Sequence, residues 1–235
     1  MLEPQTTVAR AVLDHSECAA VFQRHRIDYC CNGSRSIAAA AAARGLDTGA
    51  LLSELRRAVA ERQGTADVDV LAMATPSLVA HIVSRYHDDL RRALPFVSAL
   101  AAKVSRVHGD HAPRLRDVDA LVAELAAVLV PHLEEEEQVA FPALVARTPD
   151  PAAVRTALGA MHDDHVAVGA LLARLRDAAD DYRVPEWACT SYRTLFSELA
   201  QLETDVHYHV HLENHVLMPR FAAERDAAVA PESAS

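Results

Sequence analysis

The sequence predicts an all-α protein in which a small helical N-terminal domain precedes a four-helix bundle. Two observations indicate this fold class. Glycine occurs only seven times and aromatic residues make up 5% of the chain, whereas alanine and leucine are abundant, and this composition favours helices. Apolar residues also recur at helical spacing along four long stretches, and no alternating run of Val, Ile and Thr between turn residues stands out.

The N-terminal domain is expected to span residues 1–63. Candidate N-caps precede its expected helices at Thr7, at Ser36, and at Asp47 or Thr48. Gly45 follows the alanine-rich segment 37–44, where a helix C-terminus favours glycine. A domain of about 60 residues has a marginal core, so we expect it to dock on the rest of the chain or on a partner.

The four-helix bundle is expected to span residues 77–224, after a linker at 64–76 and before a disordered tail at 225–235. Its apolar stripes predict helices at 77–106, 114–147, 151–182 and from 185 through 216. The connections are short, as between antiparallel neighbours. Pro131 and Pro142 each cost about 3 kcal/mol inside a straight helix, so the second stretch is either kinked or divided into two helices.

Charge and hydropathy restrict the partners and the location. The formal net charge is −10, which disfavours nucleic acid and anionic membrane surfaces. No apolar run reaches the length of about 18 residues that a transmembrane helix needs, and no signal-peptide pattern opens the chain. We therefore expect a cytoplasmic protein in which the cysteines are thiols rather than disulfides.

Two short stretches repeat one pattern, a histidine four residues before a glutamate. On a helix this spacing places the imidazole and the carboxylate on one face. Sorting the thirteen histidines by helical face gives each long helix one histidine on its apolar stripe. The inward-facing set is His87, His132, His165 and His209, with Glu136 and Glu213 on the same faces as the second and fourth histidines.

This set predicts a metal centre. Burying four imidazoles and two carboxylates without partners would cost several kcal/mol per charged group, and metal ions satisfy all of them together. The nitrogen and oxygen donors suit borderline first-row metals, iron above all, and six side chains are too many for one ordinary ion. We therefore predict two iron ions bridged by Glu136 and Glu213. The alternative is a set of core polar groups that satisfy one another.

The remaining histidines and glutamates are expected to lie outside this centre. Three histidines form a separate stripe on the fourth helix: His207, His211 and His215. We interpret that stripe as a solvated face or as an adventitious zinc or nickel site. Glu137 is the alternative ligand to Glu136 if the helix is distorted after Pro131.

Cys30 and Cys31 are adjacent, and a disulfide between neighbours closes a strained ring that forms reluctantly. The pair is either structural or able to bind a soft metal or to accept a persulfide, a nitrosyl group or a cluster fragment. Cys18 and Cys189 are expected to be small buried hydrophobic residues.

Several motifs resemble those of one known family. The N-terminal match is Ile27-Asp28-Tyr29-Cys30-Cys31-Asn32-Gly33, followed by Gly45-Leu46-Asp47. The matches in the bundle are Arg85-Tyr86-His87, Arg106-Val107-His108, His132-x-x-x-Glu136-Glu137-Gln138 with Phe141-Pro142, Glu186-x-Ala188-Cys189-Thr190, and His209-x-x-x-Glu213-Asn214 with Pro219. These motifs resemble those of the RIC family, the di-iron proteins for repair of iron centres. In that family a double-cysteine domain precedes a hemerythrin-like four-helix bundle.

This resemblance implies iron ligands and a role in repair. It implies an oxo- and carboxylate-bridged di-iron centre whose histidine ligands are His87, His132, His165 and His209. Glu136 and Glu213 would be the bridging carboxylates. The resemblance also implies a functional role for Cys30 and Cys31. It implies a cytosolic stress protein that restores iron-sulfur clusters damaged by nitric oxide or peroxide, with damaged iron-sulfur proteins as its clients, by supplying iron.

Three alternatives stay open at this point. The first is an enzyme that reduces nitric oxide to nitrous oxide at the di-iron site. The second is a hemerythrin-like sensor or carrier of oxygen or nitric oxide, and the third is a helical bundle with incidental zinc. The residues do not decide between an iron donor and an enzyme, and a homodimer is compatible with the sequence.

Overall fold

The computed structural model describes residues 2–61 and 69–221. Within these ranges every regular element is a helix, apart from one isolated bridge between Thr7 and Ser36, so the all-α prediction is confirmed. The predicted tail and the first residues of the predicted linker lie outside the described ranges. In the described part of the chain, no helix has the length and apolar character needed to cross a membrane.

The chain divides into two compact units. The first unit contains Met1–Met73 together with His207–Pro219, and the second contains Ala74–Val206 together with the residues from Arg220 onward. Helix α10 (Thr190–Leu212) is continuous and contributes residues to both units.

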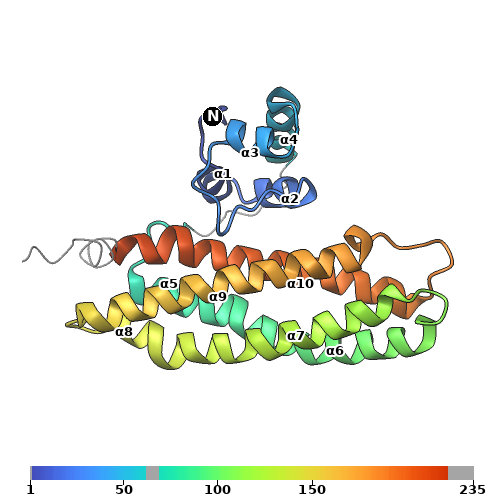
Figure 1. The fold of residues 1–235 in the computed structure, drawn as a ribbon. Coiled ribbons are helices and arrows are strands. Elements are labelled where there is room, and N and C mark those ends of the chain that lie inside the picture. The colour runs from blue at the N-terminus through green and yellow to red at the C-terminus, as the bar shows by residue number, and fades with distance from the viewer. Residues whose placement is uncertain (1, 62–68, 222–235) are drawn as a thin grey trace, which may run out of the picture. The chain divides into compact units, whose positions relative to one another are not determined.

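Four short helices form most of the first unit (Figure 1): α1 (Val8–Asp14), α2 (Glu17–Arg24), α3 (Ile37–Ala43) and α4 (Thr48–Ala60). The expected caps are confirmed, because the side chains of Thr7, Ser36 and Asp47 each accept a hydrogen bond from a backbone N–H in the first helical turn. Gly45 has a φ of 67°, the left-handed conformation that favours glycine after a helix.

Gly33 lies where the chain leaves no room for a side chain. A Cβ atom at this position would lie 2.7 Å from Cβ of Ala9 and 2.7 Å from Nε2 of His215, and closer still to the carbonyl oxygen of Tyr29. The loop that carries the two adjacent cysteines can therefore approach these neighbours only with glycine here.

Replacing Gly33 by alanine is therefore expected to destabilise the protein by about 1–3 kcal/mol, the usual cost of overpacking. Chemical denaturation measures this change in the free energy of unfolding. Gly159→Ala on α9 (Pro151–Ala178) is the matched control, because a Cβ there has no neighbour within 4 Å, and alanine should stabilise the helix by about 0.5–1 kcal/mol. Equal effects of the two changes would contradict the close approach at Gly33.

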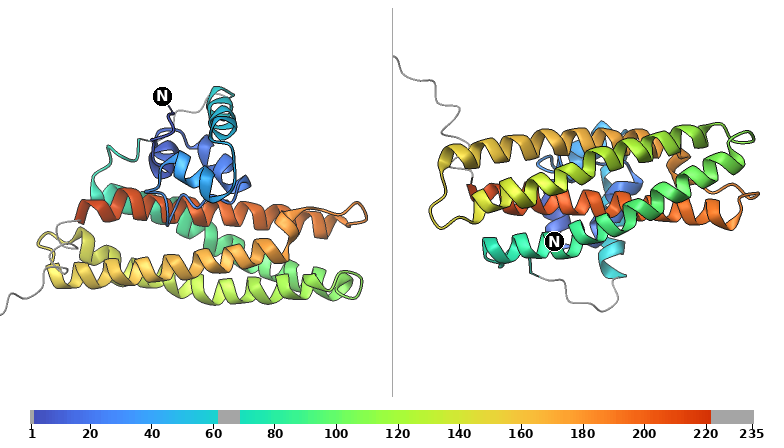
Figure 2. Two further views of the ribbon diagram at one scale, coloured as in Figure 1. Left: turned by 45° about the horizontal axis from the view of Figure 1, so that its top comes forward. Right: turned by 90° about the horizontal axis from the view of Figure 1, so that it is seen from below.

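The second unit is built from long helices that lie side by side (Figures 1 and 2). The first helical path runs through α5 (Thr75–Ile82), η1 (Val83–His87) and α6 (Asp88–His108). The second runs through α7 (Arg114–Glu135), η2 (Glu136–Ala140) and α8 (Phe141–Val145). Helices α9 and α10 complete the set, and α7 packs against both α6 and α9, so the predicted four-helix bundle is confirmed.

The connection between α9 and α10 is longer than predicted. Helix α9 ends at Ala178, because Asp180, Asp181 and Tyr182 in the short helix η3 (Asp180–Tyr182) all have positive φ values of 50–58°. Helix α10 begins at Thr190 rather than at 185. The intervening turn is held by Arg193, whose guanidinium donates hydrogen bonds to main-chain carbonyl groups of the turn.

The distortion predicted from proline in the second helix takes the form of a π turn. Pro131 lies inside α7, whereas η2 is a five-residue π turn that directly precedes Phe141 and Pro142. A π turn contains one more residue per turn than an α-helix. Two further π turns occur in the described chain, at η1 and at η4 (Glu213–Leu217).

The π turn at η2 also changes which residues face the core. Val139 follows His132 by seven residues, a spacing that would place both on one face of a regular helix, but Val139 is 52% exposed. Because the extra residue rotates the positions within the turn relative to a regular helix, Val139 points outward, whereas Ala140 and Phe141 are buried.

Candidate metal centre

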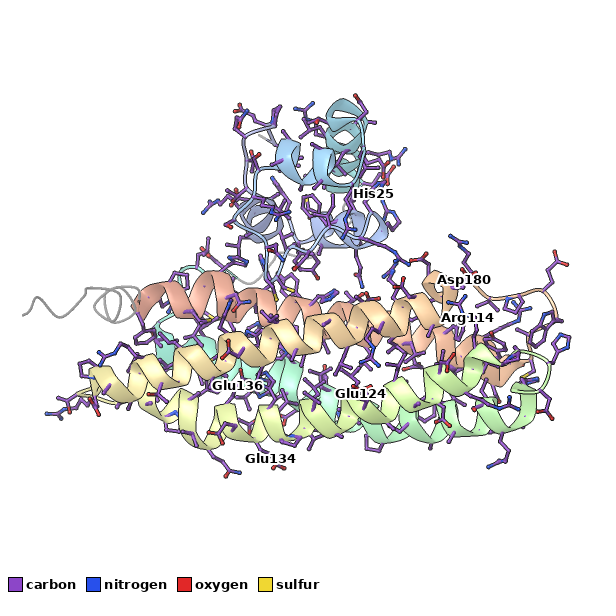
Figure 3. All side chains as sticks on the ribbon, viewed as in Figure 1. His25, Arg114, Glu124, Glu134, Glu136 and Asp180 are labelled. Carbon is purple, nitrogen blue, oxygen red and sulfur yellow. The ribbon has the colours of Figure 1, made fainter. Side chains whose placement is uncertain are left out.

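Glu136 lies at the centre of a cluster of buried histidines in the second unit. It is the first residue of η2, and it is 1% exposed. Its two carboxylate oxygens lie 3.3 Å from Nε2 of His132, 3.4 Å from Nε2 of His165 and 3.5 Å from Nε2 of His87. Figure 3 labels Glu136 between the long helices and Glu134 on the outer side of α7.

The second His-x-x-x-Glu pair has the same local geometry. His209 lies in the last turn of α10 and Glu213 opens the π turn η4. Their closest nitrogen and oxygen atoms are 3.1 Å apart, and both side chains are fully buried. Both glutamates therefore begin a π turn, one turn after their histidine.

Potential ligand atoms converge in two overlapping groups. Within each group all ligand atoms lie within 4.8 Å of one another. One group is His132, Glu136, His165 and His209, and the other is His87, Glu136, His209 and Glu213. The structure thus brings together all six side chains predicted to face inward.

The donor set fits metal ions. Imidazole nitrogens and carboxylate oxygens are the ligands of borderline divalent metals such as iron and zinc. The two groups share Glu136 and His209, which is the arrangement expected where two ions lie side by side. All six side chains are buried, so positive charge at this place would offset the cost of keeping two carboxylates away from water.

Two further carboxylates hold the histidine rings from outside the cluster. Nδ1 of His87 donates to Glu137 over 2.8 Å, and Nδ1 of His132 lies 3.2 Å from Asp164. With Nδ1 protonated, the Nε2 lone pair of each ring faces the cluster. Glu137, weighed as an alternative ligand, is therefore an outer partner of His87.

Glu137 is kept ionised for this role. Its partial burial acts to raise the pKa of the carboxyl, but hydrogen bonds from Arg91 and His87 outweigh burial and hold the pKa below its usual value. The Arg91 contact is 2.7 Å long. Asp164 was not selected from the sequence, although it directly precedes His165 on α9. Its partner lies on another helix, so helical spacing alone could not identify it.

A cavity leads from the surface to two of the candidate ligands. Its volume is about 270 Å³, and it lies between η2 and α9, with His132 and Glu136 in its wall. Small side chains line most of the rest: Ala140, Ala143, Ala153, Ala157 and Ala160. Glu135 and Asp164 add negative charge. A passage of this size and charge suits a small molecule or a cation.

Filling this cavity is expected to slow the uptake of metal. Ala160 is an exposed position of α9 that lines the cavity, so Ala160→Phe should obstruct the passage without overpacking the core. The rate at which metal-free protein takes up ferrous or cobalt ions, followed by absorbance, measures the effect. Ala167→Phe is the control, because it is exposed on the same helix outside the cavity. Equal uptake rates in the two variants would exclude this cavity as the route.

The adjacent cysteines lie in the first unit. Cys30 is buried and Cys31 is half-buried, and their sulfur atoms are 3.6 Å apart. Contact with the Cys31 thiol and burial raise the pKa of Cys30 well above its usual value. Cys18 is buried, as expected. The expectation for Cys189 is wrong, because it is exposed in the turn before α10, with its sulfur 3.1 Å from Nε2 of His108.

The histidine stripe on α10 is not a solvated face. His211 is fully buried, and its Nδ1 donates to the carbonyl oxygen of Tyr29 over 3.1 Å. The Tyr29 ring makes edge contacts with the rings of His207 and His211. Burial lowers the pKa of His211 to about 3, so it is neutral at pH 7. The prediction failed because the residues that cover this stripe are distant in sequence.

Comparison with known proteins finds a family match for each of two stretches of the chain. Residues 78–221 match the family described as the hemerythrin HHE cation binding domain, and residues 4–59 match ScdA_N, described as a domain of unknown function (DUF542). The chain is 32% identical to the iron-sulfur cluster repair protein ScdA of Staphylococcus haemolyticus (strain JCSC1435), over 94% of this chain and 100% of that protein. It is also 32% identical to the iron-sulfur cluster repair protein YtfE of Enterobacter sp. (strain 638), over 90% of this chain and 94% of that protein.

Proposed function

Given that this chain belongs to the hemerythrin HHE cation-binding family, we propose that it is a di-iron protein that repairs iron-sulfur clusters damaged by nitrosative or oxidative stress. It donates iron to damaged iron-sulfur proteins in the cytoplasm. The observation that carries this proposal is the convergence of four histidines and two glutamates in two overlapping groups. The names of the relatives, which are iron-sulfur cluster repair proteins, supply the class of reaction.

The donor set supports the release of iron as well as its binding. Iron bound here would supply an exchangeable, redox-active metal to an acceptor. The chain offers only imidazole and carboxylate groups in this cluster, and ferrous iron binds such ligands less tightly than later first-row metals do. A damaged cluster offers sulfur ligands, so transfer from the His and Glu set to that acceptor is chemically reasonable.

The residues around the cluster have distinct roles in this proposal. Glu137 and Asp164 orient the rings of His87 and His132 through their outer nitrogens. The cavity beside His132 and Glu136 provides the passage for iron. Cys30 and Cys31 supply thiols that act on the client or on the iron in transit.

Nitric oxide reduction is the second candidate function, and the same cavity favours it. A space of about 270 Å³ that reaches His132 and Glu136 admits a diatomic molecule. In this reaction two molecules of nitric oxide take up two electrons and two protons and give nitrous oxide and water. The carboxylates Glu135 and Asp164 in the cavity wall are the groups through which protons would pass.

Cluster restoration on a damaged client tests the proposal. Iron-loaded protein is mixed anaerobically with a [4Fe–4S] enzyme that nitric oxide has inactivated, and the cluster absorbance and the activity of the client are followed. We expect restoration by the unaltered chain and none by Glu136→Ala, Glu213→Ala. Restoration that is no better than with the same concentration of free ferrous iron would disprove the donor function.

Two further readouts test the role of the cysteines and distinguish an iron donor from a nitric oxide reductase. Cys30→Ser, Cys31→Ser should keep the iron of the His and Glu cluster and lose restoration, so full restoration by this variant would remove the cysteines from the mechanism. Nitrous oxide is measured in the same vessels with an electron donor present. Multiple turnovers of nitrous oxide without loss of iron would favour the reductase over the donor.

A further inference from the structure

Asp28, Cys30 and Cys31 place three potential metal-binding atoms together in the first unit, and all three atoms lie within 4.8 Å of one another. The sulfur of Cys30 lies 3.2 Å from Oδ1 of Asp28 and 3.6 Å from the sulfur of Cys31. None of these residues belongs to the His and Glu cluster.

Asp28 fixes the shape of this loop. Its Oδ1 accepts hydrogen bonds from the backbone N–H groups of Cys30, over 3.0 Å, and of Cys31, over 2.8 Å. Its Oδ2 accepts a hydrogen bond of 2.6 Å from the side chain of Asn32. The carboxylate is therefore held in place by three donors, and both cysteine side chains start from a fixed backbone.

The two sulfurs are as far apart as thiols in contact, and this distance is also compatible with a chelated ion. A disulfide needs sulfur atoms about 2.05 Å apart, and adjacent cysteines reach that distance only in a strained ring. A tetrahedral ion with metal–sulfur bonds of about 2.3 Å separates two sulfur ligands by about 3.8 Å. The observed separation of 3.6 Å is close to this value before any ion is bound.

We propose that Asp28, Cys30 and Cys31 form a second metal site, which holds one thiophilic divalent ion of the iron(II) or zinc(II) type. The ion takes the place of the thiol hydrogen that Cys30 directs at Oδ1 of Asp28. Binding converts two thiols into two thiolates and releases two protons, with no change in oxidation state. The two thiolates and the carboxylate leave the fourth tetrahedral position to water or to a ligand from another molecule.

Asn214 supports this site from η4. Its side-chain amide donates to the carbonyl oxygen of Cys30 over 3.0 Å and lies 3.9 Å from the sulfur of Cys31. An N–H group directed at sulfur favours the thiolate form that a metal requires. Cys31 is the more exposed of the two cysteines.

Cobalt(II) distinguishes this site from the cluster in the bundle. Thiolate ligands give an intense charge-transfer absorption with cobalt, and the His and Glu cluster contains no sulfur ligand. The metal-free full-length chain is titrated anaerobically with cobalt, and the charge-transfer band is recorded. This readout depends on neither cluster repair nor the bundle site, so the second site and the proposed repair function can fail separately.

The titration is also run in Glu136→Ala, Glu213→Ala, so that the bundle cluster takes up no cobalt. In that variant we expect a charge-transfer band that saturates at one cobalt ion per chain and is lost when Cys30→Ser, Cys31→Ser is added. Asp28→Asn keeps an oxygen that can accept both backbone N–H groups. The Asn32 amide can turn to present its oxygen to the new NH2 group, so the loop is retained while the charge is removed. Its cobalt affinity should fall at least about tenfold, the lower end of what even outer-shell partners of a metal contribute. Cys18→Ser, Cys189→Ser should keep the band.

Two results would overturn the proposal. One is the absence of a charge-transfer band in the unaltered chain, which would leave the cysteines as thiols without metal. The other is a band that survives in Cys30→Ser, Cys31→Ser and is lost in Cys18→Ser, Cys189→Ser, which would move the thiolate ligands to another place. An unchanged affinity in Asp28→Asn would remove the carboxylate from the site.

Discussion

Replacing Glu136 and Glu213 by alanine in Cys30→Ser, Cys31→Ser, which lacks the second metal site, is expected to abolish iron binding, from about two ions per chain to none. Glu136 lies 3.3–3.5 Å from the Nε2 atoms of three histidines, and Glu213 lies 3.1 Å from His209. Without them the cluster would hold four imidazoles and no negative charge, so two divalent cations would be buried without compensation. Metal analysis of anaerobically prepared protein and its optical spectrum after exposure to air measure the loss.

Glu134→Ala is the matched control for this change. Glu134 lies two residues before Glu136, on the exposed side of α7 (Figure 3). Its removal changes the charge of the same helix but leaves the cluster intact, so the iron content should stay the same. Circular dichroism of all variants checks that the helices persist. Zinc in place of iron, retained after Glu136 and Glu213 are both replaced in the chain without Cys30 and Cys31, would contradict the proposed di-iron centre.

Replacing Arg176 by methionine is expected to lower the free energy of unfolding by about 3 kcal/mol or more. Arg176 donates to Glu203 over 2.7 Å and to Asp181 over 2.9 Å, and its side chain is 13% exposed. Glu203 is only 3% exposed, so loss of the guanidinium leaves a buried carboxylate without its cation, which typically costs about 3–5 kcal/mol. Chemical denaturation followed by circular dichroism measures the change.

Arg174→Met provides the comparison on the same helix. Arg174 also forms an ion pair, with Glu124 over 3.1 Å, but both side chains are about half exposed. Exposed pairs contribute about 0–1 kcal/mol, so this change should be nearly neutral. If the two variants lost equal stability, burial would not be what makes the Arg176 contact strong.

The fold class and the six candidate ligands could be predicted from the sequence because both depend on helical periodicity. His132 and Glu136 lie on one helical path, in α7 and η2, and His209 and Glu213 lie on another, in α10 and η4. Their spacing alone placed each pair on one face. His87 and His165 followed from the apolar residues around them. The bundle then had only one interior in which these faces could meet.

The parts that could not be predicted depend on contacts between distant segments. Asp164 reaches His132 from a different helix, and Tyr29 covers His211 from a loop far away in the sequence. The exposure of Cys189 depends on where α10 begins, which the turn held by Arg193 decides. None of these contacts leaves a periodic pattern within its own segment.

The three π turns also affect how the chain tolerates changes in length. In a regular α-helix, removing one residue rotates everything that follows by about 100°, so the apolar stripe beyond the deletion would turn away from the core. Within η1, η2 or η4 the extra residue already exists, and its removal would restore a regular helix whose two flanks keep their facing. The path of the helix would survive such a deletion, whereas the glutamate that opens η2 or η4 would lose the neighbours that now direct it inward. The packing of the bundle therefore does not require the extra residue in these π turns. The residue is needed to direct side chains into the His and Glu cluster.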